Sequence, residues 1–188
     1  MTEKQIVYGY CDHVLKNIRG SKVFPNIFLD AYEADILEIT KTGFTYEYEV
    51  KLSKADFKLD AKKNNGYYAN AETNFEKVIR YKKDELIAGK RVNYFYYVVP
   101  EGLLNKTDIP IYAGLIYFKI VIVGFYNNKQ GSFNKEKIVF NTIVKAPKLC
   151  PDKINSEKLL KCFESTYYRY HQLREKYDIS TNQLKIWK

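Results

Sequence analysis

A short stretch of strictly alternating residues, positions 44–52, constrains the fold of this chain more than any other feature. Its large apolar members occupy every second position: Phe44, Tyr46, Tyr48, Val50 and Leu52. The positions between them hold Thr45, Glu47, Glu49 and Lys51. Because successive side chains of a strand point to opposite faces, this pattern predicts a β-strand with one apolar and one polar face. Gly43 and a strand-like run at 27–40 precede it, so we expect an antiparallel hairpin.

The rest of the chain is predicted to form helices and further strands. Apolar residues at helical spacing, together with capping and stop signals, predict helices at about 6–18, 53–63, 71–88 and 156–177. Runs rich in Tyr, Phe, Val and Ile predict strands at about 93–99, 113–125 and 137–145. No repeat or Pro/Gly-rich linker divides the sequence. We therefore predict one α/β domain, residues 1–188, with a mixed central β-sheet flanked by helices. A charged helical insertion is expected at about 64–92 and a C-terminal helix at about 156–177.

Aromatic residues make up 16% of the chain, and this excess fits a protein with a substantial sheet. The predicted C-terminal helix also carries an apolar stripe: Leu159, Leu160, Phe163, Tyr167, Tyr170 and Leu173. Residues at this spacing share one helix face, so we expect the stripe to pack against the domain.

Charge and cysteine usage bound the class of protein. The formal charge of +9 is compatible with a polyanionic partner such as DNA, and equally with a soluble surface that carries excess lysine. Cys11, Cys150 and Cys162 form no C-x-x-C pair, which favours a reducing interior over a disulfide framework or a zinc site. The polar start predicts no signal peptide, and the most apolar stretch, 111–126, contains Lys119 and is too short to span a membrane. We expect a soluble cytoplasmic protein with no membrane partner.

The polar face of the 44–52 strand holds the residues that could carry chemistry. Glu49 and Lys51 are two positions apart and project side by side, and Asp35 lies on the predicted partner strand. Two carboxylates from adjacent strands can converge on Mg²⁺, which binds few protein carboxylates and keeps several waters. A lysine beside such a metal can orient or deprotonate a water. Spacing alone favours a solvated strand face with a Glu–Lys pair. The acid on the partner strand, the apolar opposite face and the lysine-bearing helix that follows favour a site.

Four stretches of the chain carry a further signal: 33–39 with Gly43, 46–57 and Asp60, then 94–103, 109–117 and 145–149. Taken in this order, they resemble the PD-(D/E)XK nuclease superfamily, and within it a small phage and bacterial subgroup. The likeness covers about 26–149. It implies a restriction-endonuclease-like fold and a metal-dependent DNA endonuclease or exonuclease, a hydrolase using Mg²⁺ or Mn²⁺, in a bacterial cell or a phage-infected host.

The resemblance also implies roles for individual residues. Asp35 and Glu49 would be metal ligands, with the Val50 backbone carbonyl as a further ligand, and Lys51 would be the catalytic lysine. Ala34 stands where the motif has proline. Many relatives add a Glu from the first helix, a role for which this chain offers Asp12 or the preceding Glu3. Other acids that could serve instead are Glu33, Glu38 and Glu47.

Two groups of basic residues flank this motif. Lys54, Lys58 and Lys62 recur every four residues, and with Lys63 they could form a DNA-contacting face or an ordinary solvated helix face. A second basic zone is interpreted as a charged surface helix: Lys77, Arg80, Lys82, Lys83, Lys90 and Arg91.

The sequence argues against several other chemistries. His13 and His171 are too few for a His-based nuclease or triad, and no phosphate-binding G-x-x-x-x-G-K-[ST] loop indicates a nucleotide cofactor. The main rival to a nuclease is a catalytically inactive, nuclease-fold module that binds DNA or protein and is phage-associated. A third hypothesis is an assembly or virion-associated protein that contacts packaged nucleic acid. The oligomeric state stays open, a homodimer included.

Overall fold

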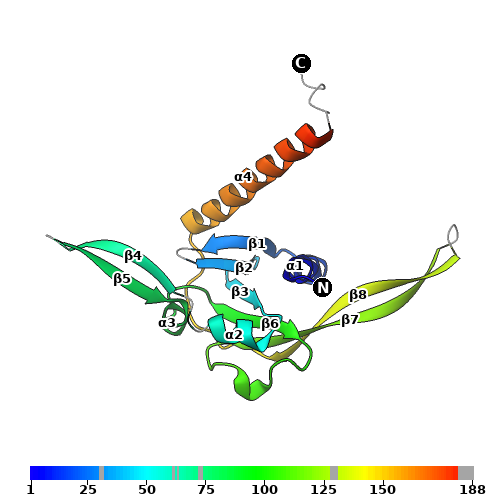
Figure 1. The fold of residues 1–188 in the computed structure, drawn as a ribbon, viewed down its shortest axis with the longest axis horizontal. Coiled ribbons are helices and arrows are strands. Elements are labelled where there is room, and N and C mark those ends of the chain that lie inside the picture. Colours follow the sequence, from blue (N-terminus) through cyan, green and yellow to red (C-terminus); the bar gives the residue numbers. More distant parts are fainter. Residues whose placement is uncertain (30–31, 61, 63, 72–73, 128–130, 182–188) are drawn as a thin grey trace.

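The computed structural model describes residues 1–29, 32–60, 62, 64–71, 74–127 and 131–181 (Figure 1). Its helices are α1 (Glu3–Asn17), α2 (Lys54–Asp60), α3 (Lys82–Ile87), the short 3-10 helix η1 (Lys106–Asp108) and α4 (Ser156–Thr181). Its strands are β1 (Lys22–Leu29), β2 (Tyr32–Ile39), β3 (Thr45–Val50), β4 (Asn64–Ala71), β5 (Asn74–Tyr81), β6 (Tyr94–Pro100), β7 (Gly114–Asn127) and β8 (Gly131–Val144).

Six strands form a mixed sheet in the order β1-β2-β3-β6-β7-β8. The β1–β2, β2–β3 and β7–β8 pairs are antiparallel, whereas β3–β6 and β6–β7 are parallel. The predicted β2–β3 hairpin is confirmed, with Ile36 opposite Tyr48 and Gly43 at φ 89° in the turn between them. Positive φ suits glycine because it has no Cβ. The predicted α/β class with a mixed central sheet flanked by helices is also confirmed.

Helix α1 covers one face of the sheet. Thr2 caps it, since the Thr2 side chain accepts from the Gln5 N–H and Gln5 bonds back to the Thr2 backbone. The buried α1 residues pack against apolar side chains of β2, β3, β6 and β7, and together they form one cluster: Ile6, Val7, Tyr10, Cys11, Val14, Ile36, Tyr48, Val50, Val98, Ile116 and Phe118. The apolar face predicted for β3 is therefore the face beneath α1.

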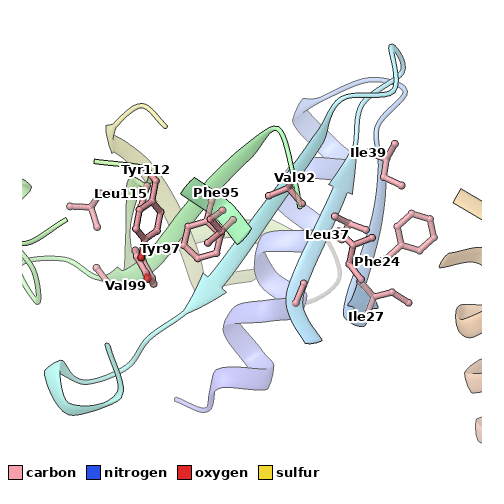
Figure 2. Close-up of a cluster of buried hydrophobic side chains, with 14 of the residues drawn as sticks. Phe24, Ile27, Leu37, Ile39, Val92, Phe95, Tyr97, Val99, Tyr112 and Leu115 are labelled. Atoms are coloured by element: carbon pink, nitrogen blue, oxygen red, sulfur yellow. The ribbon is translucent and has the colours of Figure 1, made fainter. Parts of the chain in front are cut away.

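A second cluster fills the opposite face of the sheet, and Figure 2 shows its side chains running from β1 across β2 and β6 to β7. Phe57 of α2, Leu86 of α3 and Cys162 of α4 pack with it. On this face β3 contributes Glu47 and Glu49, both fully buried, among apolar neighbours from β2 and β6. The polar face predicted for β3 thus exists, but it points into the protein rather than into solvent.

Two predicted elements are wrong. Residues 27–40 were expected as one strand, whereas the structure has two, β1 and β2. The first part of β1 was not predicted because Pro25 interrupts the strand pattern, and proline lacks the N–H that a ladder hydrogen bond needs. The next residue, Asn26, departs from strand geometry with a positive φ of 49°. Proline is tolerated here because β1 is an edge strand.

The second error is the insertion at about 64–92, which was predicted to be helical. The structure has the two-stranded hairpin β4–β5 followed by the short helix α3. The charged residues of this segment suggested a helix, but its Tyr, Phe, Val and Ile content favours strands. In Figure 1 this hairpin projects from one side of the molecule.

A second hairpin, β7–β8, projects from the other side of the molecule (Figure 1). Strand β6 pairs with β7 only as far as Phe118, so residues 119–127 pair with β8 alone. The strand predicted at 137–145 is therefore longer than expected, beginning at Gly131.

Helix α4 is confirmed, but the packing predicted for its apolar stripe is wrong. Helix α4 meets the body as far as Arg169: Phe163 packs edge-on against Phe24, and Arg169 donates to the carbonyls of Pro25 and Asn26 at 2.6 and 2.5 Å. The helix then extends away from the sheet, and Tyr167 is 59% exposed. In the part of the chain that the structure describes, none of the helices combines the length and apolar character needed to cross a bilayer.

Candidate active site on strands β2 and β3

The structure brings Asp35, Glu49 and Lys51 together. The β2–β3 register pairs Ile36 with Tyr48, and continuing it by one step places Asp35 opposite Glu49. Beyond that point the Asp35 side chain replaces a ladder contact: its Oδ2 accepts a hydrogen bond of 2.7 Å from the Val50 N–H. The next amide, Lys51 N–H, points the other way and donates to the Val98 carbonyl on β6. The two acids and the lysine therefore meet at the end of the β2–β3 ladder.

Glu49 is held between two ammonium groups. Lys51 Nζ lies 3.1 Å from Glu49 Oε2, and Lys82 Nζ contacts Glu49 Oε1. Glu49 is 0% exposed and Lys51 7%. A buried carboxylate is costly without a counter-charge, so these two lysines stabilise the ionised form of Glu49.

Lys51 also contacts the two acids of α2. Its Nζ lies 3.2 Å from Asp60 Oδ1 and 3.9 Å from Asp56 Oδ1. Tyr97 donates to the other Asp60 oxygen at 2.9 Å. Burial alone would lower the pKa of Lys51, but the charges of Glu49, Asp60 and Asp35 outweigh burial and raise it. Lys51 is accordingly an ammonium ion at neutral pH, able to donate hydrogen bonds but not to take a proton.

Asp35 has a different environment from Glu49. Burial, and then the charge of Glu49, raise the pKa of Asp35 to about 7, against the lowering effects of the Val50 N–H and Lys51. Among the described residues Asp35 forms no ion pair, and its hydrogen bond to Val50 is its polar contact. This carboxylate lies in a partly buried site with too little positive charge around it.

Glu47, two residues before Glu49 and on the same face of β3, belongs to the same buried network. Lys82 Nζ lies 2.7 Å from Glu47 Oε1, and Arg91 donates to both Glu47 oxygens at 2.6 and 2.9 Å. Arg91 also donates to the backbone carbonyls of Leu29 and Tyr32, at the ends of β1 and β2. Burial alone would raise the pKa of Glu47, but Lys82 and Arg91 lower it, so Glu47 is ionised.

The interpretation of the second basic zone as a charged surface helix is therefore wrong for Lys82 and Arg91, which are buried. As that interpretation predicted, the side chains of Lys83 and Lys90 are exposed. The side chains of Lys77 and Arg80 lie outside the described residues. Two glutamates on the inward face of β3 are the sequence signal that could have predicted buried cations, because such charges need partners.

The structure separates the alternative acids. Glu38 faces α1, and its carboxylate accepts hydrogen bonds from the hydroxyls of Tyr48 and Ser21 at 2.6 and 2.7 Å. Asp12 is exposed and pairs with Lys16. Glu47 is neutralised by Arg91 and Lys82, and Glu33 is exposed.

Glu3, which proves to be the first residue of α1, contributes to the raised pKa of Asp35. Glu3 is thus an acid of α1 whose charge acts on Asp35.

The positions of the lysines that were predicted to contact DNA are partly as expected. Lys54 and Lys58 are exposed on α2, which follows Lys51 directly and is capped by the Ser53 hydroxyl. Lys62 is also exposed but lies beyond the end of α2, so the predicted helical stripe is limited to Lys54 and Lys58. Lys63 lies outside the described residues.

The carboxylates of Asp35 and Glu49 meet only part of what a hard divalent cation such as Mg²⁺ needs. Mg²⁺ needs only one or two protein carboxylates, and Asp35 with its uncompensated charge supplies one. Glu49 can supply the second only if Lys82 leaves its Oε1. No cluster of three or more Asp, Glu, His or Cys arranged for a metal occurs among the described residues. Asp60 Oδ1 is buried and lacks a well-aligned hydrogen bond, although Lys51 lies 3.2 Å from it.

Comparison with known proteins informs the fold alone. No family model matches the chain, and no curated protein matches it. A solved structure, the SPO1766 protein of unknown function from Silicibacter pomeroyi, superposes with a TM-score of 0.53. It has 14% sequence identity, and the match covers 100% of this chain and 99% of that chain. The arrangement of helices around the mixed sheet is therefore shared with a protein whose own function is unknown.

Proposed function

We propose that this protein is a nuclease of restriction-endonuclease-like fold that hydrolyses DNA phosphodiesters with Mg²⁺ or Mn²⁺. The observation that carries the proposal is the position of Asp35: it lies opposite Glu49 and bonds to the Val50 N–H, between Glu49 and Lys51. A carboxylate kept in a site that disfavours its charge costs stability, and such costs are concentrated at functional sites.

Each residue of the trio formed by Asp35, Glu49 and Lys51 has a role in this proposal. Asp35 and Glu49 would hold the cation, with the Val50 carbonyl as a candidate third protein ligand. When bound, the cation supplies Lewis-acid stabilisation of the charge on the phosphate. Lys51, as an ammonium ion, would orient the attacking water and bind a phosphate oxygen rather than act as a base. The water oxygen bonds to phosphorus and the bond to one ester oxygen breaks. One proton of the water ends on the leaving oxygen, and the other stays on the phosphate product or passes to solvent.

The surroundings support DNA as the substrate. Lys54 and Lys58 are exposed on the helix that follows Lys51, and the chain as a whole carries +9. Lysines beside a hydrolytic centre can bind phosphates on either side of the scissile one, without regard to base sequence. The DNA would approach from the side of α2.

The experiment is a plasmid cleavage assay with purified protein and Mg²⁺. Wild type should nick or degrade the plasmid, and EDTA should stop it. Lys51→Ala should lower the rate by about 10²- to 10³-fold, as expected when a preorganised charge on the transition state is lost. Lys54→Ala is the matched control, an exposed lysine whose loss should weaken DNA binding without abolishing cleavage. Equal rates for Lys51→Ala and wild type, both folded, would refute the assignment.

One observation favours the rival, a nuclease-fold module without catalysis. Glu49 is fully buried and both its oxygens contact lysines, so the resting site is closed to a cation at this residue. If the rival is correct, the protein binds DNA with a salt-dependent affinity that Mn²⁺ leaves unchanged. Cleavage that depends on Asp35 and Glu49 would exclude it.

A further inference from the structure

Lys82 occupies an unusual place for a lysine. It is the first residue of α3, it is 1% exposed, and its Nζ contacts Glu47 Oε1 at 2.7 Å as well as Glu49 Oε1. The same Nζ lies 5.2 Å from the centre of the Phe95 ring. Burying an ammonium ion this deeply is costly, so its place is explained by the two glutamates it neutralises.

The two glutamates depend on Lys82 to different extents. Glu47 has a second cation, because Arg91 binds both of its oxygens. Glu49 has Lys51 on Oε2 and Lys82 on Oε1. Loss of Lys82 would leave Arg91 on Glu47 and Lys51 on Glu49 Oε2. It would remove the Lys82 ammonium from Glu49 Oε1, on the residue that lies opposite Asp35.

We propose that Lys82 is a resident counter-ion that a divalent cation must displace from Glu49. Loading of the metal then requires the start of α3 to move away from β3. This inference rests on the proposed metal site and adds its regulation: in the resting protein, Lys82 sets the metal affinity.

The chain around Lys82 permits such a movement. Helix α3 is only Lys82–Ile87, and it directly follows β5, which pairs only with β4 among the described strands. The preceding helix, α2, ends at Asp60, which pairs with Lys51. The β4–β5 hairpin is therefore joined to the body on both sides through residues that contact the trio. A partner or DNA that shifts this hairpin would change the contacts of Lys82.

The first test is Mn²⁺ binding measured by isothermal titration calorimetry. Lys82→Gln should bind Mn²⁺ more tightly than wild type, by on the order of tenfold or more, because a competing charge has been removed from a poorly solvated site. Lys83→Gln, a change at the adjacent exposed lysine, should leave the affinity unchanged. Equal or weaker binding by folded Lys82→Gln overturns the inference.

The second test needs no variant. Addition of Mn²⁺ to wild type should increase amide hydrogen exchange in α3, since Lys82 must leave Glu49. If Mn²⁺ binds with no change in the exchange of α3, the inference is overturned. Failure of the proposed function would give a different result: Lys82→Gln would bind Mn²⁺ more tightly than wild type, but neither protein would cleave DNA.

Discussion

The Asp35 carboxylate accepts a hydrogen bond of 2.7 Å from the backbone N–H of Val50, the residue between Glu49 and Lys51. This contact fixes an acid of β2 beside two charged side chains of β3. Burial and the charge of Glu49 raise the pKa of Asp35 to about 7, so the ionised form is held at a cost.

The first prediction is that Asp35→Asn stabilises the protein at pH 8. The amide oxygen can still accept from Val50, and the poorly compensated charge is gone. We expect a gain of up to about 4 kcal/mol in the free energy of unfolding, the value that a pKa raised from 3.8 to about 7 gives at about 1.4 kcal/mol per pKa unit. Urea titration of wild type and Asp35→Asn at pH 8 measures it, and a destabilised variant would contradict this account.

The same residue predicts a pH dependence. The pKa of Asp35 is about 7 in the folded protein against 3.8 in the unfolded chain, so between these values the folded state binds more protons. The contribution of Asp35 to wild-type stability therefore falls as pH rises from about 4 to 7. The advantage of Asp35→Asn should accordingly shrink to nearly nothing at pH 4. An advantage that is constant across this window would be inconsistent with a raised pKa.

A further prediction concerns Arg91, which joins Glu47 to the carbonyls of Leu29 and Tyr32. Arg91→Met should destabilise the protein by about 3 kcal/mol, because a buried carboxylate loses one of its cations and two backbone carbonyls lose their donor. Lys90→Met, at the adjacent exposed position, should leave the urea midpoint nearly unchanged. Thermal or urea unfolding distinguishes the two, and equal midpoints would refute the role given to Arg91.

The exposed tyrosines of α4 give the next prediction. Tyr167 and Tyr170 are 59% and 60% exposed, so their replacement by alanine should change the stability by no more than about 0.5 kcal/mol each. Phe95→Ala, at a fully buried aromatic of β6, should cost about 3 to 5 kcal/mol. Large losses at the two tyrosines would mean that α4 packs along its whole length in solution.

The elements that the sequence predicted well are those with a regular local pattern. Strict alternation at 44–52 located β3 and its two faces, and Gly43 located the turn that precedes it. Strand β1 could not be predicted in the same way, because Pro25 and Asn26 interrupt its pattern. The prediction for the β4–β5 hairpin was wrong because its charged residues are typical of a surface helix, whereas its aromatic and β-branched residues favour strands.

The candidate site was predictable where it depends on neighbouring strands and not where it depends on distant segments. Asp35, Glu49 and Lys51 follow from one hairpin and its register. Lys82 is 33 positions from Glu49 and Arg91 is 44 from Glu47, and local spacing cannot show that those cations become buried against β3. The exposed stripe on α4 has the same origin, since helical spacing indicates an apolar face but not what covers it.

The most direct measurement is the rate of Mg²⁺-dependent plasmid cleavage by wild type and by Asp35→Asn at pH 8. Because this substitution is expected to stabilise the fold, unfolding cannot explain a loss of activity. The account predicts cleavage by wild type and a rate lower by on the order of a hundredfold or more for the variant, through loss of a metal ligand. Asp12→Asn, at an exposed acid of α1 that pairs with Lys16, should cleave as wild type does. Cleavage by Asp35→Asn at the wild-type rate, or no cleavage by wild type with Mg²⁺ or Mn²⁺, would contradict it.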